Sequence, residues 1–162
     1  MESVSKDFLG ILFQYQGIIH KVNLIYFKTD EDREDNFQEV VYHLWKSFPA
    51  LKDRNKIGSW IYAVAINVSV SKIRKDSRYV PLEPIPDDRL TDETDNIEHA
   101  MNFQQLMEAI HCLDEIDKSI MLLYLEEYSY NQIADTIGIS SLNVGVRINR
   151  AKKQLKHYLM SK

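Results

Sequence analysis

The last part of the chain carries amide and cationic side chains of the kinds that bind DNA. From Ser140 onward there are six lysines and arginines and no acidic residue. Amide groups can form hydrogen bonds with base edges in a major groove, and cations can pair with phosphates. On a helix, the side chains that we expect to face DNA are Ser141, Asn143, Val146, Arg147, Asn149, Arg150, Lys152 and Lys153.

The residues around this group predict a helix-turn-helix that would hold it. Ser129 and Gln132 have the spacing of a capping box, which starts a helix. Gly138 can adopt the left-handed backbone of a tight turn, after which Ser140 or Ser141 can cap a second helix. The apolar stripe of that second helix consists of Val144, Ile148, Ala151 and Leu155. An ordinary helical hairpin with a solvated basic face is the alternative.

A second group of cations, with aromatic residues beside them, lies between residues 43 and 78. This segment holds eight lysines and arginines against two aspartates. Aromatic rings can stack on unpaired bases while cations pair with phosphates, which is how proteins bind single-stranded DNA. The expected contacts are Lys52, Arg54, Asn55, Lys56, Trp60, Tyr62, Asn67, Lys72, Arg74 and Lys75. Aromatic residues at helical spacing also occur in cores, which is the alternative for Trp60 and Tyr62.

Composition and charge are those of a folded protein with segregated charges. The 162 residues are 44% hydrophobic, which is enough for packed cores. The net charge of −4 argues by itself against nucleic-acid binding, but the acidic residues gather in segments 30–39 and 83–98, away from the basic ones. No run approaches the roughly 18 apolar residues of a membrane span, so we expect a cytoplasmic protein. The single cysteine, Cys112, is expected to pack in a core.

Apolar residues recur at helical spacing along almost the whole chain, which predicts an all-α fold. Helices are predicted over 34–48, ended by Pro49, and over 59–75, with Ser59 as the N-cap. Three prolines and a run of acidic residues between 77 and 98 indicate an acidic flexible linker. We therefore predict two small helical domains, 1–76 and 99–162, the second containing the helix-turn-helix.

Taken together, these segments resemble the extracytoplasmic function group of bacterial sigma factors. Residues 35–46, DNFQEVVYHLWK, look like the polymerase-binding helix of that family, with its Asp, its Gln-Glu pair and its Leu-Trp followed by a cation. Residues 59–67, SWIYAVAIN, are similar to its promoter-melting segment. The helix-turn-helix is similar to its C-terminal domain, including the run Arg150-Ala151-Lys152. The resemblance covers nearly the whole chain in the family's order.

The resemblance implies that residues 1–76 (sigma region 2) bind core RNA polymerase and recognise and melt the −10 element, and that residues 99–162 (sigma region 4) read the −35 element. The polymerase-binding residues would be Asp35, Gln38, Glu39, Tyr42 and Trp45. Loop 52–56, with Asn67, would hold the non-template strand with one base turned out of the stack. The implied partners are promoter DNA and the clamp helices and flap of the large polymerase subunits, with no membrane insertion. Factors of this group are often held by an anti-sigma factor, and control by expression alone is the alternative.

The chain departs from the family pattern at four positions. Ala63 and Ile66 stand where the family commonly carries Arg, which removes two potential phosphate contacts. Gly145 and Val146 occupy places where polar or basic side chains often read DNA. The expected −35 contacts therefore shift toward Asn143, Arg147 and Asn149.

Two other classes of protein are the alternatives to a sigma factor. A conventional helix-turn-helix regulator, with an N-terminal sensing or dimerisation domain, needs only the last third of the chain to be as predicted. An enzyme has little support, because Glu108 and His111 form one Glu-x-x-His unit where a di-iron site needs two. Glu39 and His43 are four residues apart and can share a helix face, where we expect a surface pair rather than a metal site. We therefore expect no catalytic residues, no metal and no cofactor.

Overall fold

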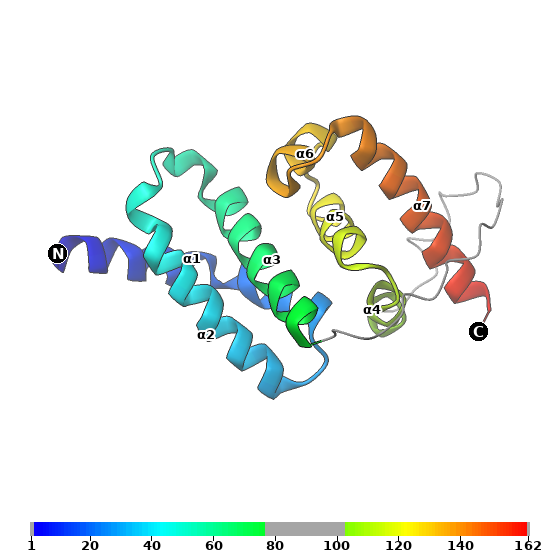
Figure 1. The fold of residues 1–162 in the computed structure, drawn as a ribbon, viewed down its shortest axis with the longest axis horizontal. Helices are drawn as coiled ribbons and strands as arrows, with labels where there is room; N and C mark the ends of the chain where they lie inside the picture. The colour runs from blue at the N-terminus through cyan, green and yellow to red at the C-terminus, as the bar shows by residue number, and fades with distance from the viewer. Residues whose placement is uncertain (1, 77–102, 162) are drawn as a thin grey trace. The chain divides into compact units, whose positions relative to one another are not determined.

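The computed structural model describes residues 2–76 and 103–161 (Figure 1). These residues form seven α-helices and two short 3-10 helices, with no strand among them, which confirms the prediction of an all-α fold. The chain divides into two compact units, residues 1–76 (unit 1) and 77–162 (unit 2). The predicted linker 77–98, and residues 99–102 of the predicted second domain, lie outside the described residues. No helix of the described ranges is both long and apolar enough to cross a membrane.

Unit 1 is a three-helix assembly of α1 (Glu2–Tyr26), α2 (Asp30–Ser47) and α3 (Ile57–Asp76), in which each helix contacts the other two (Figure 1). Two 3-10 helices, η1 (Phe48–Ala50) and η2 (Arg54–Lys56), lie between α2 and α3. All three α-helices contribute to one apolar core, which includes Phe8, Ile19, Val22, Val40, Leu44, Ile61 and Ala65. Because the core occupies one side of α2 and of α3, their opposite sides are left for other contacts.

Both helix starts predicted in unit 1 were wrong. Helix α2 begins four residues earlier than position 34, because the Thr29 side chain accepts a hydrogen bond from the Asp32 amide at 3.2 Å. The acidic residues that follow favour that helix end, where the helix dipole is positive. Ser59 is not a cap, since α3 already begins at Ile57. Asp53 caps the preceding 3-10 turn by accepting from the Asn55 amide at 3.0 Å.

A buried polar cluster joins the three helices of unit 1. The Asn36 amide of α2 donates to Asn23 Oδ1 of α1 at 2.7 Å and to Ser69 Oγ of α3 at 2.9 Å. Asn23 in turn donates to the carbonyl of Arg33 at 3.1 Å, and Ser69 donates to the carbonyl of Ala65 at 2.7 Å. Among the described residues, Asn36 Oδ1 has no hydrogen-bond partner. Since these bonds require one relative placement, the cluster fixes how the three helices align.

Unit 2 contains α4 (Phe103–His111), α5 (Glu115–Leu125), α6 (Tyr130–Ile137) and α7 (Ser141–Met160), and α7 contacts each of the other three (Figure 1). The predicted apolar stripe of α7 is confirmed, because Val144, Ile148, Ala151 and Leu155 are all buried. The core assignment of Cys112 was wrong, since this residue is exposed. Helix α4 ends at His111, so the helical periodicity stops there, and Leu113 takes the core position instead.

Candidate nucleic-acid and protein interfaces

The turn between α6 and α7 has the geometry of a helix-turn-helix. The Gln132 amide donates to Ser129 Oγ at 3.1 Å, and the Ser129 amide donates to Gln132 Oε1 at 2.9 Å, so the predicted capping box is present. Helix α6 ends at Gly138, whose φ of 87° is left-handed, and the Gly138 amide donates to the carbonyl of Ala134 at 2.8 Å. Ser140 is the residue that caps α7.

Replacing Gly138 by Ala is expected to lower the free energy of unfolding of unit 2 by about 1 kcal/mol, because a side chain with Cβ is strained at this φ. The control is Gly17→Ala in α1, where an added Cβ meets nothing within 4 Å. That change should stabilise unit 1 by about 0.5–1 kcal/mol. Far-UV circular dichroism follows both units in denaturant, and tryptophan fluorescence follows unit 1, which holds both tryptophans. Equal effects of the two changes would contradict the assignment.

Most of the α7 side chains expected to face DNA lie on its accessible sides. The exposed ones are Ser141, Asn143, Val146, Asn149 and Arg150, and the half-buried ones are Lys152 and Lys153. Lys152 lies against α5, where its Nζ donates to Tyr124 Oη at 2.7 Å and stands 4.5 Å from the ring centroid. Leu142, which is not among the predicted DNA contacts, is 79% exposed. The sequence could have indicated this residue, because Leu142 lies four residues before Val146 and therefore on the same side of the helix.

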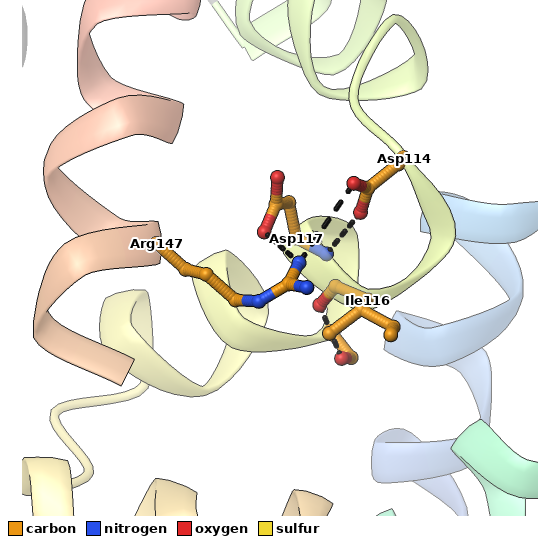
Figure 2. A network of polar contacts seen from close by, with 5 residues as sticks. Asp114, Ile116, Asp117 and Arg147 are labelled. Atoms are coloured by element: carbon orange, nitrogen blue, oxygen red, sulfur yellow. Dashed lines mark hydrogen bonds and ion pairs between the residues drawn. The ribbon is translucent and has the colours of Figure 1, made fainter. Parts of the chain in front are cut away.

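Arg147 takes part in an ion pair inside unit 2 (Figure 2). Its Nη1 donates to Asp117 Oδ1 of α5 at 3.0 Å and lies 3.8 Å from Asp114 Oδ2. The Asp117 side chain is 3% exposed, and that of Arg147 is 24% exposed. Burial raises the pKa of the Asp117 carboxyl, and the nearby Asp114 raises it further, while Arg147 opposes both effects. The expectation that Arg147 faces DNA is therefore revised: in this structure it fastens α7 to α5.

Helix α3 presents one face that suits contact with unpaired DNA. Trp60, Asn67 and Arg74 recur at intervals of seven residues, and Asn67 and Arg74 are exposed while Trp60 is half-buried. Tyr62 does not belong to this face, because it is 2% exposed and lies in the core. A separation of two residues turns a helix by about 200°, so Trp60 and Tyr62 cannot point the same way. The assignment of Tyr62 as a DNA contact was therefore wrong.

The cations predicted beside this face are accessible to different extents. Lys52, Arg54, Asn55, Lys56 and Lys75 are exposed, and Lys72 is half-buried, with its Nζ 5.9 Å from the centroid of the Phe27 ring. Arg54 forms a 3.4 Å ion pair with Asp7, and both side chains are more than half exposed. Because such surface pairs contribute only about 0–1 kcal/mol, Arg54 can exchange Asp7 for a phosphate at little cost.

Helix α2 presents a different kind of surface. Apart from the adjacent pair Gln38 and Glu39, its exposed residues follow one another at intervals of three or four and share one face, called the α2 face below: Asp35, Gln38, Glu39, Tyr42 and Trp45. Tyr42 is 56% exposed and Trp45 is 42% exposed. Trp45 also packs edge-on against Phe8, with 5.1 Å between ring centroids. Aromatic side chains within a partly polar surface are typical of protein–protein interfaces.

Metal chemistry has no geometric support in residues 2–76 and 103–161. No group of three or more His, Cys, Asp or Glu side chains in these ranges is arranged to hold a metal ion. The pair Glu39 and His43 therefore lacks companion ligands among the described residues, and so does the pair Glu108 and His111. The interfaces described above carry binding groups: cations, amides and aromatic rings.

Comparison with known proteins gives two family matches, one in each unit. The Sigma-70 region 2 family model matches residues 12–79, and the Sigma-70, region 4 model matches residues 103–155. The first match includes the α2 face and α3, and the second includes the helix-turn-helix. Together the two models cover most of the chain.

Individual relatives agree with these matches. The chain is 27% identical over 138 residues to the ECF RNA polymerase sigma factor SigE of Mycolicibacterium smegmatis, covering 81% of this chain but only 53% of that protein. It is 26% identical to the RNA polymerase sigma factor HrpL of Pseudomonas syringae, covering 82% and 76%. Among solved structures, the sigma factor RpoE of Bartonella quintana, in complex with the anti-sigma factor NepR, has the same fold: the TM-score is 0.69 at 16% identity, covering 99% and 98%.

Proposed function

The chain belongs to the sigma-70 family of bacterial RNA polymerase sigma factors, in the extracytoplasmic function group, and we propose that its two units divide the work of promoter-specific transcription initiation. Residues 1–76 act as sigma region 2, which binds core RNA polymerase and opens the −10 element. Residues 99–162 act as sigma region 4, which reads the −35 element. The observation that carries this proposal is the presence, in one chain, of the α2 face and a helix-turn-helix.

Each interface has a distinct task in this proposal. The α2 face docks on the clamp helices of polymerase. The outer face of α3, with loop 52–56, holds the non-template strand of the −10 element: Trp60 offers a ring for stacking, Asn67 offers an amide, and the cations pair with phosphates. Helix α7 enters the major groove of the −35 element. Extruding a base costs a few kcal/mol, which the contacts of unit 1 must supply.

The protein acts in this proposal by binding alone. Sigma factors recognise DNA for polymerase, so we assign no catalytic step, no cofactor and no metal to this chain. The site of action is the cytoplasm, where polymerase and promoter DNA are found. Core polymerase and promoter DNA are the principal partners, and an anti-sigma protein is a further partner of the kind that often holds factors of this group.

The test is transcription in vitro with bacterial core polymerase and a pool of genomic DNA fragments. RNA 5′ ends should gather at specific sites when the protein is present and should be absent without it. Gel filtration of the protein mixed with core polymerase should show a complex. A protein that binds duplex DNA by itself but does not bind core polymerase would instead be a conventional helix-turn-helix regulator, and the proposal would fail.

A further inference from the structure

Two apolar side chains stand on the outward side of α7, opposite its buried stripe. Leu142 is 79% exposed and Val146 is 50% exposed, whereas Val144 and Ile148 between and after them are fully buried. A spacing of four residues places Leu142 and Val146 one turn apart on the same ridge. Because the two side chains are adjacent, they form one contiguous apolar patch rather than two isolated exposed residues, and contiguous patches are the kind that mark interaction sites.

The neighbouring residues extend this apolar surface. The nearest atom to a Cβ added at Gly145 is Tyr130 Cε2 of α6, at 3.4 Å. A Cβ would meet the ring at ordinary van der Waals distance, so the ring of Tyr130, which is 43% exposed, lies beside the first turns of α7. Arg147, the one cation among residues 141–149, is held by Asp117 on the flank. The outward side of α7 is therefore apolar in the first turns of the helix.

The same ridge becomes basic further along. Arg150 is exposed and Lys153 is half-buried, and both lie on the side of α7 that is away from its core. The segment from Ser140 to the end of the chain contains no acidic residue. An apolar protein surface would match the first half of this ridge but not the second. DNA matches both, because its major groove carries apolar methyl groups between rows of phosphates.

We propose that Leu142 and Val146 select thymine in the −35 element by contacting its C5-methyl group, while Arg150 and Lys153 hold the adjacent phosphates. This inference rests on the proposed function, and it adds a specificity that the family match does not supply. The thymine methyl is the one apolar group that a base pair displays in the major groove. A sequence preference then follows from burial of methyl groups rather than from hydrogen bonds to base edges.

The experiment uses the full chain bound to core polymerase. Duplexes with a randomised upstream element are first selected for binding, and each selected thymine is then replaced by deoxyuridine, which lacks only the methyl group. At one or two positions the replacement should weaken binding about fourfold, as expected for one buried methyl. In the Leu142→Ala, Val146→Ala double variant, thymine and deoxyuridine should bind equally at those positions.

Two controls separate methyl contact from other effects. Met160→Ala removes a side chain that is 77% exposed at the far end of α7, and it should leave the fourfold preference intact. Lys153→Ala should weaken binding to all duplexes and lower the salt dependence by about one phosphate contact, while keeping the preference.

Two outcomes would overturn the inference. If deoxyuridine binds as well as thymine at every position in the wild-type complex, methyl groups are not read. If the preference survives in the double variant, other residues read them. In both cases selection by the polymerase complex would still succeed, so the proposed function would stand. Failure of the protein to form that complex would overturn the proposed function and this inference together.

Discussion

A chain carrying Gln38→Ala and Tyr42→Ala is expected to bind core RNA polymerase about a hundredfold more weakly, because both changes remove central side chains of the α2 face and such residues each contribute about 1–2 kcal/mol. Both residues are exposed, and Tyr42 is 56% exposed, so the fold should not depend on them. Promoter-specific transcription should fall with the binding. The affinity can be measured by titrating labelled protein with core polymerase.

Tyr42 is a sharper target on this face than Trp45. Trp45 packs against Phe8 at 5.1 Å, so its removal would also disturb the core of unit 1. The matched control is Gln14→Ala, which removes an exposed glutamine from α1 rather than from α2. The control should bind polymerase as the wild type does. A double variant with wild-type affinity for core polymerase would show that the α2 face is not the docking surface.

Arg147→Ala is expected to destabilise unit 2 by about 2–4 kcal/mol, because it leaves the buried carboxylate of Asp117 without its cation. Unfolding should be followed by two signals. Tryptophan fluorescence follows unit 1, so the fluorescence transition should not move. The part of the circular dichroism signal that comes from unit 2 should be lost at a lower denaturant concentration. If instead both signals shift together, or neither does, this ion pair is not what fastens α7 to α5.

The cost of Arg147→Ala should grow as the pH rises from about 4 toward neutrality. The pKa of Asp117 is raised in the folded unit, so the folded unit binds this proton more tightly than the unfolded chain does. The stabilisation that comes from protonated Asp117 is complete at a pH below the pKa of this carboxyl in the unfolded chain. It is lost as the pH rises through the pKa of the same carboxyl in the folded unit. Arg147 opposes this loss by pairing with the carboxylate. Without it the folded pKa rises further, and the loss extends to higher pH.

Asp117→Asn provides the matched background for this measurement. An asparagine has no buried charge to leave unpaired, so Arg147→Ala should cost much less in an Asp117→Asn chain than in the wild type. The cost in that background should also lose most of its pH dependence. A cost that is equal in both backgrounds would mean that Arg147 stabilises the unit through contacts other than this pair.

The features that could be predicted from the sequence were the local ones. The capping box at Ser129 and Gln132 spans three residues, and the turn at Gly138 depends on one residue type, so both were visible as patterns. The apolar stripe of α7 was visible for the same reason. The face of α3 could also have been deduced, because the helical angle between Trp60 and Tyr62 excludes a shared surface.

Features that depend on distant residues could not be predicted in this way. Arg147 and Asp117 are 30 positions apart, and nothing local distinguishes a cation that faces DNA from one that faces α5. The predicted helix starts were wrong because residue type alone does not identify a cap. Thr29 caps α2 and Asp53 caps the 3-10 turn before α3, whereas Ser59, which is an equally suitable residue type, lies inside α3. Cys112 was misassigned because the end of α4 interrupts its apolar run.

The buried cluster of Asn23, Asn36 and Ser69 has a consequence for how this sequence can evolve. Each of these side chains satisfies another, so an apolar replacement at one position strands a polar group on a neighbouring helix. The three positions should therefore vary together among descendants of this chain, and single exchanges should be selected against. An engineered hybrid that takes α1 from one relative and α2 and α3 from another would carry a mismatch wherever the two parents differ at these three positions.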